Sequence, residues 1–417
     1  MKLNPSFLWW IVILLFLIGS PLRSQVDVAM IFLRNSPSPL LNGMGQVGTA
    51  LLTEEVYALY YNPAHLGLVS RHNNAVLSIY PAQTDWLPGL QFSDLKLYSM
   101  AVNLGYEFKN IWRTLTLRAG LGYMYTKLDL GSSVVTDEQG NIIGRYESWE
   151  NYNALCAGLG IEYYIQLSFG LALKHAKSEL GLPEIQVGAE TRSTGSESDM
   201  IDYGFHIFVP ILRFYTDPIK NSANPQQAWL PEFDFSLGYT KANIGDPVPY
   251  YLTNLPLPLP RTARLGYAVS IGLDWYYNSQ WFKIFSADYS VDALDLLIDK
   301  EHSNRIQSGL LGDIHIGNNL LKGNADQNVD VHKDYRFRFF ETFQILSGSW
   351  DGENWNKPVT SGFAFTLKGL FKYLASVSDN QIIQYIGRHF DLQYVYSKVD
   401  VEGENPWDGT EYQSLTI

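Results

Sequence analysis

The sequence predicts an all-β fold, a transmembrane antiparallel β-barrel of roughly 14 strands as counted by side-chain alternation. Three observations predict it. Segments of about ten residues alternate between apolar and small or polar side chains, as membrane strands do. The composition is rich in aromatic residues and poor in charge. After Gln25, no apolar run approaches the roughly 18 residues that a helical membrane span requires.

The composition suits a surface in contact with lipid. Of the 417 residues, 46% are hydrophobic and 14% are aromatic, including 27 Tyr and 11 Trp. Only 17% are charged, below the roughly 25% of ordinary soluble domains. A barrel needs an apolar outer belt with Tyr and Trp at both membrane interfaces. A secreted soluble β-protein shares part of this profile and is the alternative.

Residues 1–24 are expected to form a secretory signal peptide. Lys2 supplies the positive charge, the run from Phe7 to Ile18 supplies an apolar core, and Ser24 is a small residue before Gln25. The core has 12 residues, too few for a bilayer that helices cross with roughly 20. A retained anchor is the alternative. Export follows from this prediction. Together with the predicted barrel, it implies the outer membrane of a Gram-negative bacterium, with its lipid as a partner.

Residues 25–70 are expected to form a plug segment inside the barrel, which residues 71–417 would build. Gly43, Gly45 and Gly48 permit the backbone to approach a wall closely, and Asn62-Pro63 stops a helix and redirects the chain. A first strand with its turn is the alternative. The three glycines also match G-x-G-x-x-G, but no buried strand precedes them and no α/β pattern follows, so dinucleotide binding is rejected.

The strands follow one another through the rest of the chain. From Leu115 to Tyr125, odd positions are mostly large and apolar, whereas even positions are mostly small or polar. Sandwich strands average roughly 5–6 residues, whereas membrane strands need about 9–11, and the longer figure fits. The predicted strands begin near Ala75, Leu95, Leu115, Ala154, Leu167, Asp202, Phe233, Thr262, Trp281, Gln307, Tyr335, Ser361, His389 and Glu411. The strand near Gln307 has the weakest pattern.

Four long polar stretches are expected to be loops, because an unpaired backbone cannot face hydrocarbon. They are Ser132 to Asn151, Glu179 to Met200, Tyr215 to Glu232 and Gly317 to Lys333. Outer-membrane barrels place long loops outside and short turns in the periplasm. At the C-terminus, Leu415 and Ile417 keep the alternation, although Ile417 replaces the usual terminal aromatic residue.

Charged residues on the small or polar face are predicted to line the lumen. Charges there would pair across the lumen or hold the plug, because unpaired buried ions are costly. A structural ionic network is favoured over a proton or substrate relay. The predicted set is Arg118, Glu162, Lys174, Asp234, Arg264, Asp274, Asp288, Arg336, Arg338, Lys368 and Asp391.

No cofactor, metal or catalytic site is predicted. Asp326, Asn328 and Asp330 have the spacing of a calcium loop, but Val331 and Phe337 replace its required Gly and Glu. No Ser lies in a G-x-S-x-G motif, so an enzyme is not expected. The net charge of −12 argues against nucleic acid as a partner. A single cysteine, Cys156, excludes an intramolecular disulfide.

The early segment resembles the N-terminal signature of the PorV/PorQ family, within the wider group of FadL-type barrels. The resemblance rests on the Gly-rich turn with Met44, the acidic Glu54-Glu55, and an aromatic-Asn-Pro-Ala-x-Leu stretch, where His65 stands in place of a frequent Gly. Residues 242–247 and 256–261 add weaker matches. The plug motif consists of Gly43, Gly45, Gly48, Tyr61, Asn62, Pro63, Ala64 and Leu66.

The resemblance implies a hatch packed in the lumen and one of two functions. PorV-type barrels act in protein export by the type IX secretion system, where they contact the translocon and receive cargo through its C-terminal signal domain. FadL-type transporters instead pass hydrophobic small molecules through a kinked wall. Because the predicted lumen is polar or small, the sequence favours the secretion role. A structural barrel without transport is a third alternative.

Overall fold

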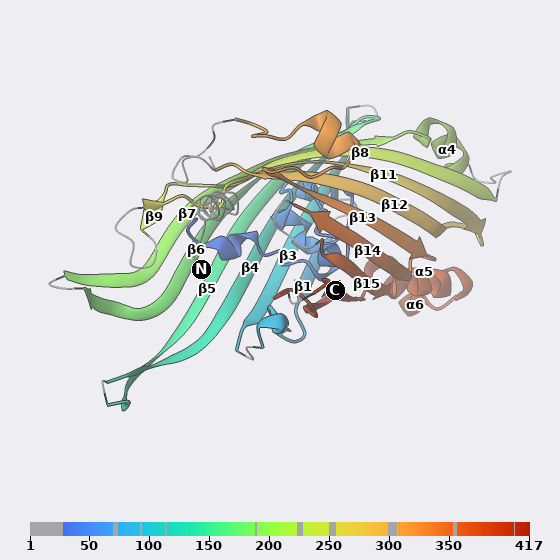
Figure 1. Cartoon of the computed structure of the whole chain (residues 1–417). Coiled ribbons are helices and arrows are strands. Elements are labelled where there is room, and N and C mark those ends of the chain that lie inside the picture. The colour runs from blue at the N-terminus through green and yellow to red at the C-terminus, as the bar shows by residue number, and fades with distance from the viewer. Residues whose placement is uncertain are drawn as a thin grey trace, which may run out of the picture.

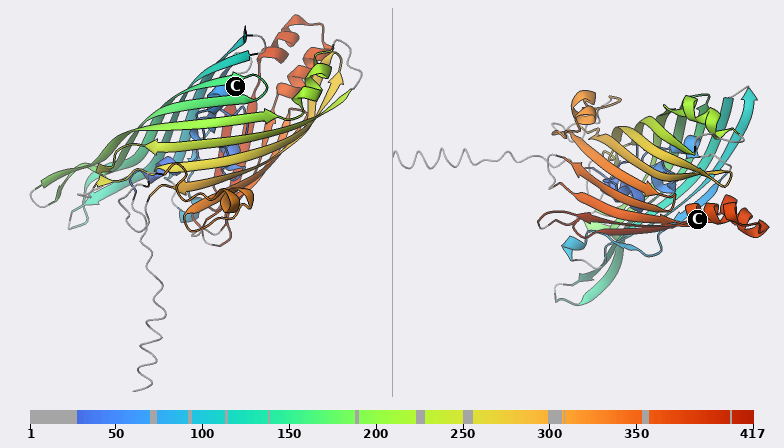
Figure 2. Two further views of the ribbon diagram at one scale, coloured as in Figure 1. Left: turned by 90° about the horizontal axis from the view of Figure 1, so that it is seen from above. Right: turned by 90° about the vertical axis from the view of Figure 1, so that its right-hand side faces the viewer.

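The computed structural model describes residues 28–69, 74–91, 94–112, 115–137, 139–187, 190–222, 228–249, 256–298, 307, 309–352, 357–403 and 405–417. The predicted signal peptide, residues 1–24, lies outside the described residues. Figures 1 and 2 show an antiparallel barrel with a folded segment in its interior.

The barrel closes on itself. Fifteen strands form one sheet in which every described pairing is antiparallel, and β1 (Ala75–Ile79) pairs with both β3 (Lys96–Trp112) and β17 (Glu411–Thr416). The short β2 (Thr84–Asp85) lies beside β3, so fourteen strands surround the lumen. The predicted barrel of roughly 14 strands is confirmed.

The other strands follow in chain order, each paired with its neighbours. They are β4 (Leu115–Thr136), β5 (Ile142–Glu162), β6 (Gln166–Val187), β7 (Glu190–Pro210), β8 (Trp229–Ile244), β11 (Thr262–Tyr277), β12 (Gln280–Leu296), β13 (Val329–Phe339), β14 (Phe343–Asp351), β15 (Val359–Thr366) and β16 (Gln393–Asp400). A separate two-stranded pair, β9 (Val248–Pro249) and β10 (Pro256–Leu257), lies between β8 and β11.

Helices occur inside the barrel and at its ends. The interior segment contains η1 (Ile31–Arg34), α2 (Pro39–Asn42), η2 (Val56–Tyr60) and α3 (His65–Val69), and η3 (Pro88–Leu90), α4 (Arg213–Lys220), η4 (Ile316–Leu321), α5 (Lys368–Val377) and α6 (Gln381–His389) lie in connections. Among the described residues, no helix is long and apolar enough to cross a membrane.

The two ends of the barrel differ. One end carries tight turns, such as residues 163–165 between β5 and β6 and residues 278–279 between β11 and β12; we call it the short-turn end. The opposite end carries the β4–β5 and β6–β7 hairpins, which project far from the barrel (Figure 1); we call it the long-hairpin end. β1 begins and β17 ends toward the short-turn end.

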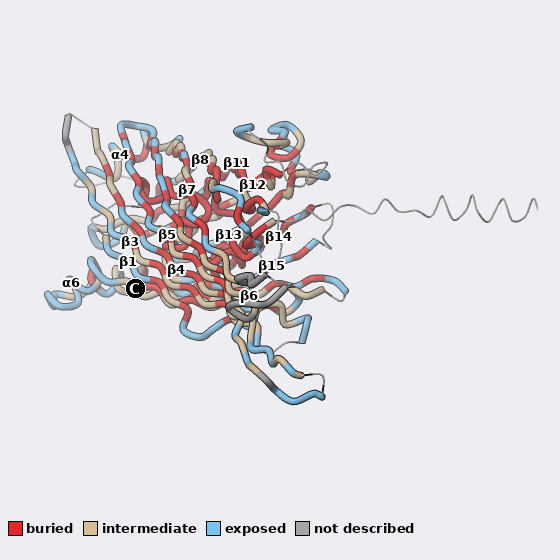
Figure 3. Tube along the Cα trace, turned by 90° about the vertical axis from the view of Figure 1, so that its left-hand side faces the viewer, coloured by how far each residue is buried: buried red, intermediate tan, exposed pale blue. Residues whose placement is uncertain are grey.

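The wall is apolar outside and small or polar inside. On β5, the outward Leu155 and Leu159 are 59% and 64% exposed, whereas Ala154 and Cys156, the neighbours of Leu155 in the chain, are buried. This alternation recurs around the barrel (Figure 3). A soluble protein has the reverse arrangement, because apolar side chains leave water. The outer surface is therefore built for contact with lipid.

One predicted strand is absent from the structure, and one strand of the structure was not predicted. The strand predicted near Gln307 does not form; residues 309–328 are turns and the helical element η4. The strand missed by the sequence analysis is β14, where Phe343 and Ile345 face outward and Gln344 and Leu346 are buried. Because β14 follows a turn of only three residues after β13, the two strands read as one apolar segment.

Two of the four predicted loops were mostly wrong, and the other two were partly wrong. Stretches 132–151 and 179–200 belong largely to β4–β5 and β6–β7, which continue as self-paired hairpins. Polar strands form there because a hairpin outside the hydrocarbon needs no apolar face. The stretch 215–232 contains most of α4 and the start of β8, and 317–333 contains most of η4 and the start of β13.

Candidate functional site

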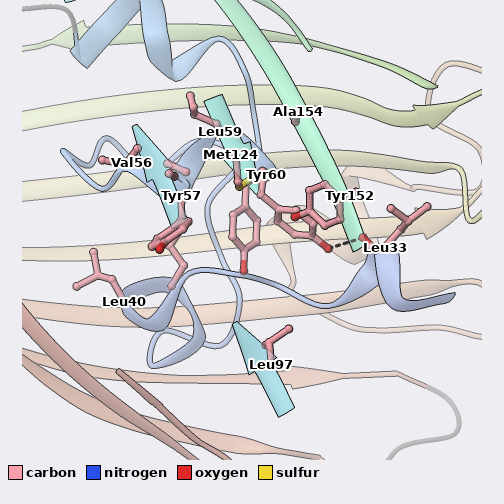
Figure 4. Packing of buried hydrophobic residues seen from close by; sticks show 14 of the residues in the cluster. Leu33, Leu40, Val56, Tyr57, Leu59, Tyr60, Leu97, Met124, Tyr152 and Ala154 are labelled. Atoms are coloured by element: carbon pink, nitrogen blue, oxygen red, sulfur yellow. Dashed lines mark hydrogen bonds between the residues drawn. The ribbon is translucent and has the colours of Figure 1, made fainter. Parts of the chain in front are cut away.

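The interior segment, residues 28–69, fills the lumen, and we call it the plug. Tyr57, Tyr61 and Leu66 are fully buried or nearly so, with exposed fractions of 0–1%. Tyr60 donates a hydrogen bond to the Leu33 carbonyl at 3.1 Å, and their cluster packs against Tyr152 of β5 (Figure 4). The plug thus supplies the apolar core that the polar inner wall lacks.

Wall glycines let the plug backbone touch the barrel. A Cβ added at Gly170 would lie 2.2 Å from the carbonyl carbon of Pro63, and one at Gly238 would lie 2.0 Å from the Thr49 oxygen. A Cβ added at Gly348 would likewise lie 2.2 Å from the Gly45 nitrogen. The small residues that alternate along the strands are therefore the contact surface for the plug.

Polar side chains of the wall bind the plug backbone. Oδ2 of Asp292 accepts hydrogen bonds from the Gly48 and Thr49 amides at 3.0 and 2.9 Å and from the Thr49 hydroxyl at 2.7 Å. His206 bonds the Ala50 carbonyl at 2.7 Å, and His332 bonds the Gly45 carbonyl at 2.7 Å. The sequence analysis missed these three residues; their inward register on alternating strands places them on the lumen face but does not single them out.

Within the predicted plug motif, Asn62 makes three hydrogen bonds. Asn62 donates from its amide to the carbonyls of Thr49 and Phe205, both at 2.9 Å, and accepts from the Ala64 amide at 3.0 Å. It thus joins two parts of the plug to β7. Gly45 has φ of 64°, which favours glycine.

The other motif residues line the same contact. Gly43 lies against Ser397 and Leu346, and Gly48 lies under the Tyr61 ring. Leu66 faces Gly122 and Gly158 of the wall, and Pro63 and Ala64 lie over Gly170. The structure therefore places all eight predicted motif residues in the plug, at its turns or at its contacts with strands.

Several predicted lumen charges contact or neighbour the plug directly, among them Lys174 and Arg264. Lys174 forms a buried ion pair with Asp202 at 2.5 Å and lies 5.7 Å from the centres of the Tyr60 and Tyr152 rings. Arg264 lies 5.0 Å from the Tyr61 ring centre and donates to the Gln46 carbonyl at 3.2 Å. Each charge has a partner, as an ion in a buried site requires.

The remaining predicted charges gather toward the short-turn end. Arg118 pairs with Glu107 and Glu162, and Glu162 also pairs with Arg213 of α4. Asp274 pairs with Lys220, which binds Glu232 as well. Asp288 accepts hydrogen bonds from Arg336 at 2.8 Å and from Arg338 at 3.4 Å. Lys368 forms an ion pair with Glu54 of the plug, and Asp391 accepts a hydrogen bond from Thr366. Asp234 is half-buried on β8.

Burial shifts the pKa of two plug residues. Burial raises the pKa of the Glu55 carboxyl to about 7, so it carries its proton in mildly acidic solution. Burial lowers the pKa of His65 to about 4, and its Nε2 lies 2.8 Å from the Gly48 carbonyl. The plug therefore holds both side chains uncharged over a range in which exposed groups ionise.

The barrel wall contains a recess beside β7. Its volume is about 700 Å³, and its lining includes the outward Leu155, Leu173 and Ile201 as well as the inward Lys174 and Met200. Pairing of β7 with β8 stops at Ile201, where the register shifts, whereas β7 continues to Glu190 beside β6. The recess thus lies where two neighbouring strands separate.

One cavity beside the plug is small. A cavity next to Tyr60, Tyr61 and Arg264 has a volume of about 20 Å³, room for about one water molecule. Within the described residues, no group of three or more His, Cys, Asp or Glu side chains could hold a metal ion. The recess and the plug are therefore the features to which a function can be attached.

Comparison with known proteins adds structural likeness only. No family model and no curated protein matches the chain. Similar solved structures include the toluene transporter TodX of Pseudomonas putida (10% identity, 91% of this chain and 96% of TodX covered, TM-score 0.36) and the toluene transporter TbuX of Ralstonia pickettii (11%, 92% and 97%, 0.35). A FadL homologue of Pseudomonas aeruginosa is similar as well (7%, 94% and 98%, 0.35). Likeness this low carries no functional argument.

Proposed function

We propose that this chain is an outer-membrane barrel that binds hydrophobic small molecules in its wall recess and passes them inward, as FadL-type transporters do. The observation that supports this proposal is the recess lining, which combines lipid-facing leucines with lumen residues. An apolar molecule could enter from the bilayer side without crossing an open aqueous pore. This reverses the preference that the sequence alone gave.

The size and chemistry of the recess suit such a ligand. Binding sites for small molecules have volumes of about 300–1,000 Å³ and are mostly apolar with few polar groups. Leu155, Leu173 and Met200 supply apolar surface and Arg261 supplies a cation. The lining also includes Lys174, His175, Asp199 and Asp246. Nε of Arg261 is buried and has no hydrogen-bond partner within the described residues. An apolar chain with an acidic head group therefore fits the recess best.

Binding of a fluorescent fatty acid tests this proposal. In detergent-purified full-length protein, 11-(dansylamino)undecanoic acid should bind with saturation, and Arg261→Gln should weaken binding roughly tenfold, the scale of a lost charge-assisted hydrogen bond. Lys177→Gln is the matched control, because Lys177 is an exposed cation paired with Glu197 on neighbouring β7. Absence of saturable binding, or equal affinity in both variants, would remove the support for this function.

A second proposal keeps the barrel in protein export by the type IX secretion system, with the translocon and cargo C-terminal domains as partners. The β4–β5 and β6–β7 hairpins favour it. From Ser132 to Glu147 the first hairpin pairs only with itself, and its Val134 and Ile142 are 52% and 57% exposed. A ribbon that pairs only with itself leaves strand edges open, and open strand edges are templates for pairing with another chain.

Affinity purification from outer membranes distinguishes the two proposals. The tagged full-length chain should bring down the translocon or signal-domain cargo, identified by mass spectrometry, if the export proposal is right. A variant that lacks residues 133–146 should then lose these partners while its barrel remains folded. Recovery of bulk porins alone would count against export and leave the small-molecule proposal standing.

A further inference from the structure

The helical hairpin formed by α5 and α6 carries an exposed apolar face. Leu370, Tyr373, Leu374 and Val377 are 40–49% exposed and recur at i, i+3, i+4 and i+7 along α5. This is the spacing of one helix face, normally buried in a core. On α6, the apolar side chains Ile382, Tyr385 and Ile386, and Phe390 just beyond it, are also exposed.

The hairpin is a fixed structure. A Cβ added at Gly387 of α6 would lie 2.5 Å from the Cβ of Ala375 and from the Phe371 oxygen, so the two helices touch along their backbones. The Asn380 side chain accepts a hydrogen bond from the Ile382 amide at 2.8 Å and caps α6. The contact between α5 and α6 therefore fixes the orientation of the exposed apolar face, which points away from that contact.

The base of the hairpin packs on the outer surface of the barrel. Tyr373 stacks on Tyr277 with ring centres 6.3 Å apart and meets Phe282 at 6.5 Å. Phe282 pairs in register with Trp275, whose ring stacks on Tyr277. Lys372 covers Phe282 and binds Glu341 in the β13–β14 turn. The hairpin therefore leaves the wall among aromatic side chains at the short-turn rim (Figures 1 and 2).

We propose that α5 and α6 lie in the interfacial layer of the membrane leaflet at the short-turn end, with their apolar face among the lipid chains. The occupant is lipid because the exposed face is continuous with the lipid-facing wall through Tyr277, Phe282 and Tyr373. Helices with one apolar face and low mean hydropathy bind this layer, about 5–10 Å into the boundary between head groups and chains. The proposal is independent of what the recess binds.

Depth-dependent quenching tests this placement in the full-length protein reconstituted into phosphatidylethanolamine–phosphatidylglycerol nanodiscs. Cys156→Ser first removes the native cysteine. Three separate variants, Tyr385→Cys, Leu159→Cys and Gln139→Cys, then each carry one nitrobenzoxadiazole label. Brominated phospholipids should quench the label at position 385 by about half or more, strongest with bromines near the head group. Position 159 on the wall should be quenched by deep bromines, and position 139 in the exposed β4–β5 turn should not be quenched.

The outcomes separate the proposal from its competitors. Quenching at 159 without quenching at 385 would overturn it. Light scattering tests the competing explanation that a second copy of the chain covers the helices. A dimer in which the helices are covered would also overturn the proposal. Lack of quenching at 159 would instead contradict the spanning barrel itself. A variant of the full-length protein with Ile382→Glu, which keeps the α5–α6 contact, should show about tenfold faster hydrogen exchange over residues 381–389 in nanodiscs; an unchanged exchange rate would contradict the proposal.

Discussion

At the scale of single residues, the inner wall fits the plug because glycines without a side chain face it. Gly170, Gly204 and Gly238 face plug atoms at 2.0–2.2 Å from an added Cβ, so even one methyl group has no room. Ordinary packing arguments assign small residues to turns or close crossings. Here the small residues mark the positions on successive strands at which the plug backbone crosses the inner wall.

Gly170→Ala should lower the stability of the folded barrel by about 1–3 kcal/mol, the cost of overpacking a tight contact. The added Cβ would meet the Pro63 carbonyl carbon at 2.2 Å. Thermal unfolding followed by heat-modifiable gel mobility measures the change. Gly144→Ala on β5 is the matched control, since no atom lies within 4 Å of its added Cβ. Equal midpoints for both variants would show that the plug is not held against β6.

The protonation of Glu55 should make the plug more stable in acid. Its folded pKa is about 7, whereas an unfolded carboxyl has a pKa of roughly 4.3. Stability is therefore highest below the unfolded pKa and falls as pH rises toward 7, because only the unfolded chain ionises freely in that window. Glu55→Gln should abolish this fall.

Protease resistance of the plug between pH 4.5 and 8 measures this effect. The low pKa of His65, about 4, acts in the opposite direction below pH 6.5, because an unfolded histidine takes up a proton there. The comparison of wild type with Glu55→Gln removes that contribution, since His65 is common to both. Parallel pH profiles for the two proteins would contradict the assignment to Glu55.

Residue-scale reasoning from sequence singled out the motif residues, which lie in the plug, but not the wall residues that bind them. Asn62 was identified because Asn-Pro changes the chain direction, a local property. Asp292 and His206 were missed because their roles depend on strand register, and a single sequence gives no reason to select one inward polar residue above another. The charge on Glu162 was placed in the lumen, but its partner Arg213 lies on α4, in a stretch for which no helix was predicted.

At the scale of elements, the polar ends of the long hairpins are the main difference from expectation. The pattern of apolar alternation marks only the part of a strand that meets lipid. Ser132 pairs with Glu147 and Glu184 pairs with Ser193, beyond any neighbour in the barrel. Sequence predicts the hydrocarbon-spanning length well, but strands that continue into water have no apolar face to reveal them.

Replacement of residues 133–146 with Asn-Gly, which joins the paired Ser132 and Glu147, should leave the unfolding midpoint of the barrel within about 1 °C. The hairpin there pairs only with itself, and Asn-Gly is a favoured two-residue turn. The measurement is heat-modifiable mobility of the outer-membrane fraction. A large drop in the midpoint would mean that the hairpin supports the wall.

At the scale of the whole molecule, the plug and the ion pairs close the lumen in two layers. The plug is bonded to the wall by Asp292, His206 and His332, and the charge network around Arg118 and Asp288 lies toward the short-turn end. Closure of the sheet was predictable because open edges cannot face lipid. How much of the lumen the plug leaves free depends on how tightly the plug fits, which side-chain patterns do not encode.

Reconstituted protein should show no steady ion conductance in planar bilayers. Asp292→Ala, combined with Asn62→Ala, should produce openings, since it removes acceptors and donors of five plug hydrogen bonds to Gly48, Thr49 and Phe205. Asp199→Ala with Asn141→Ala is the matched control, because both side chains are exposed. A conducting wild type, or a silent double variant with a loosened plug, would contradict this view of closure.

The direction in which the plug runs constrains how the molecule is made. Ala29 donates a hydrogen bond to the Pro258 carbonyl near the long-hairpin end, while α3 packs against β4, β5 and β6 farther along. The first segment of the chain therefore enters from the side opposite to its first strand. Such a segment crosses the lumen from one end to the other, so assembly must either wrap the wall around it or thread it through after β1 and β17 join.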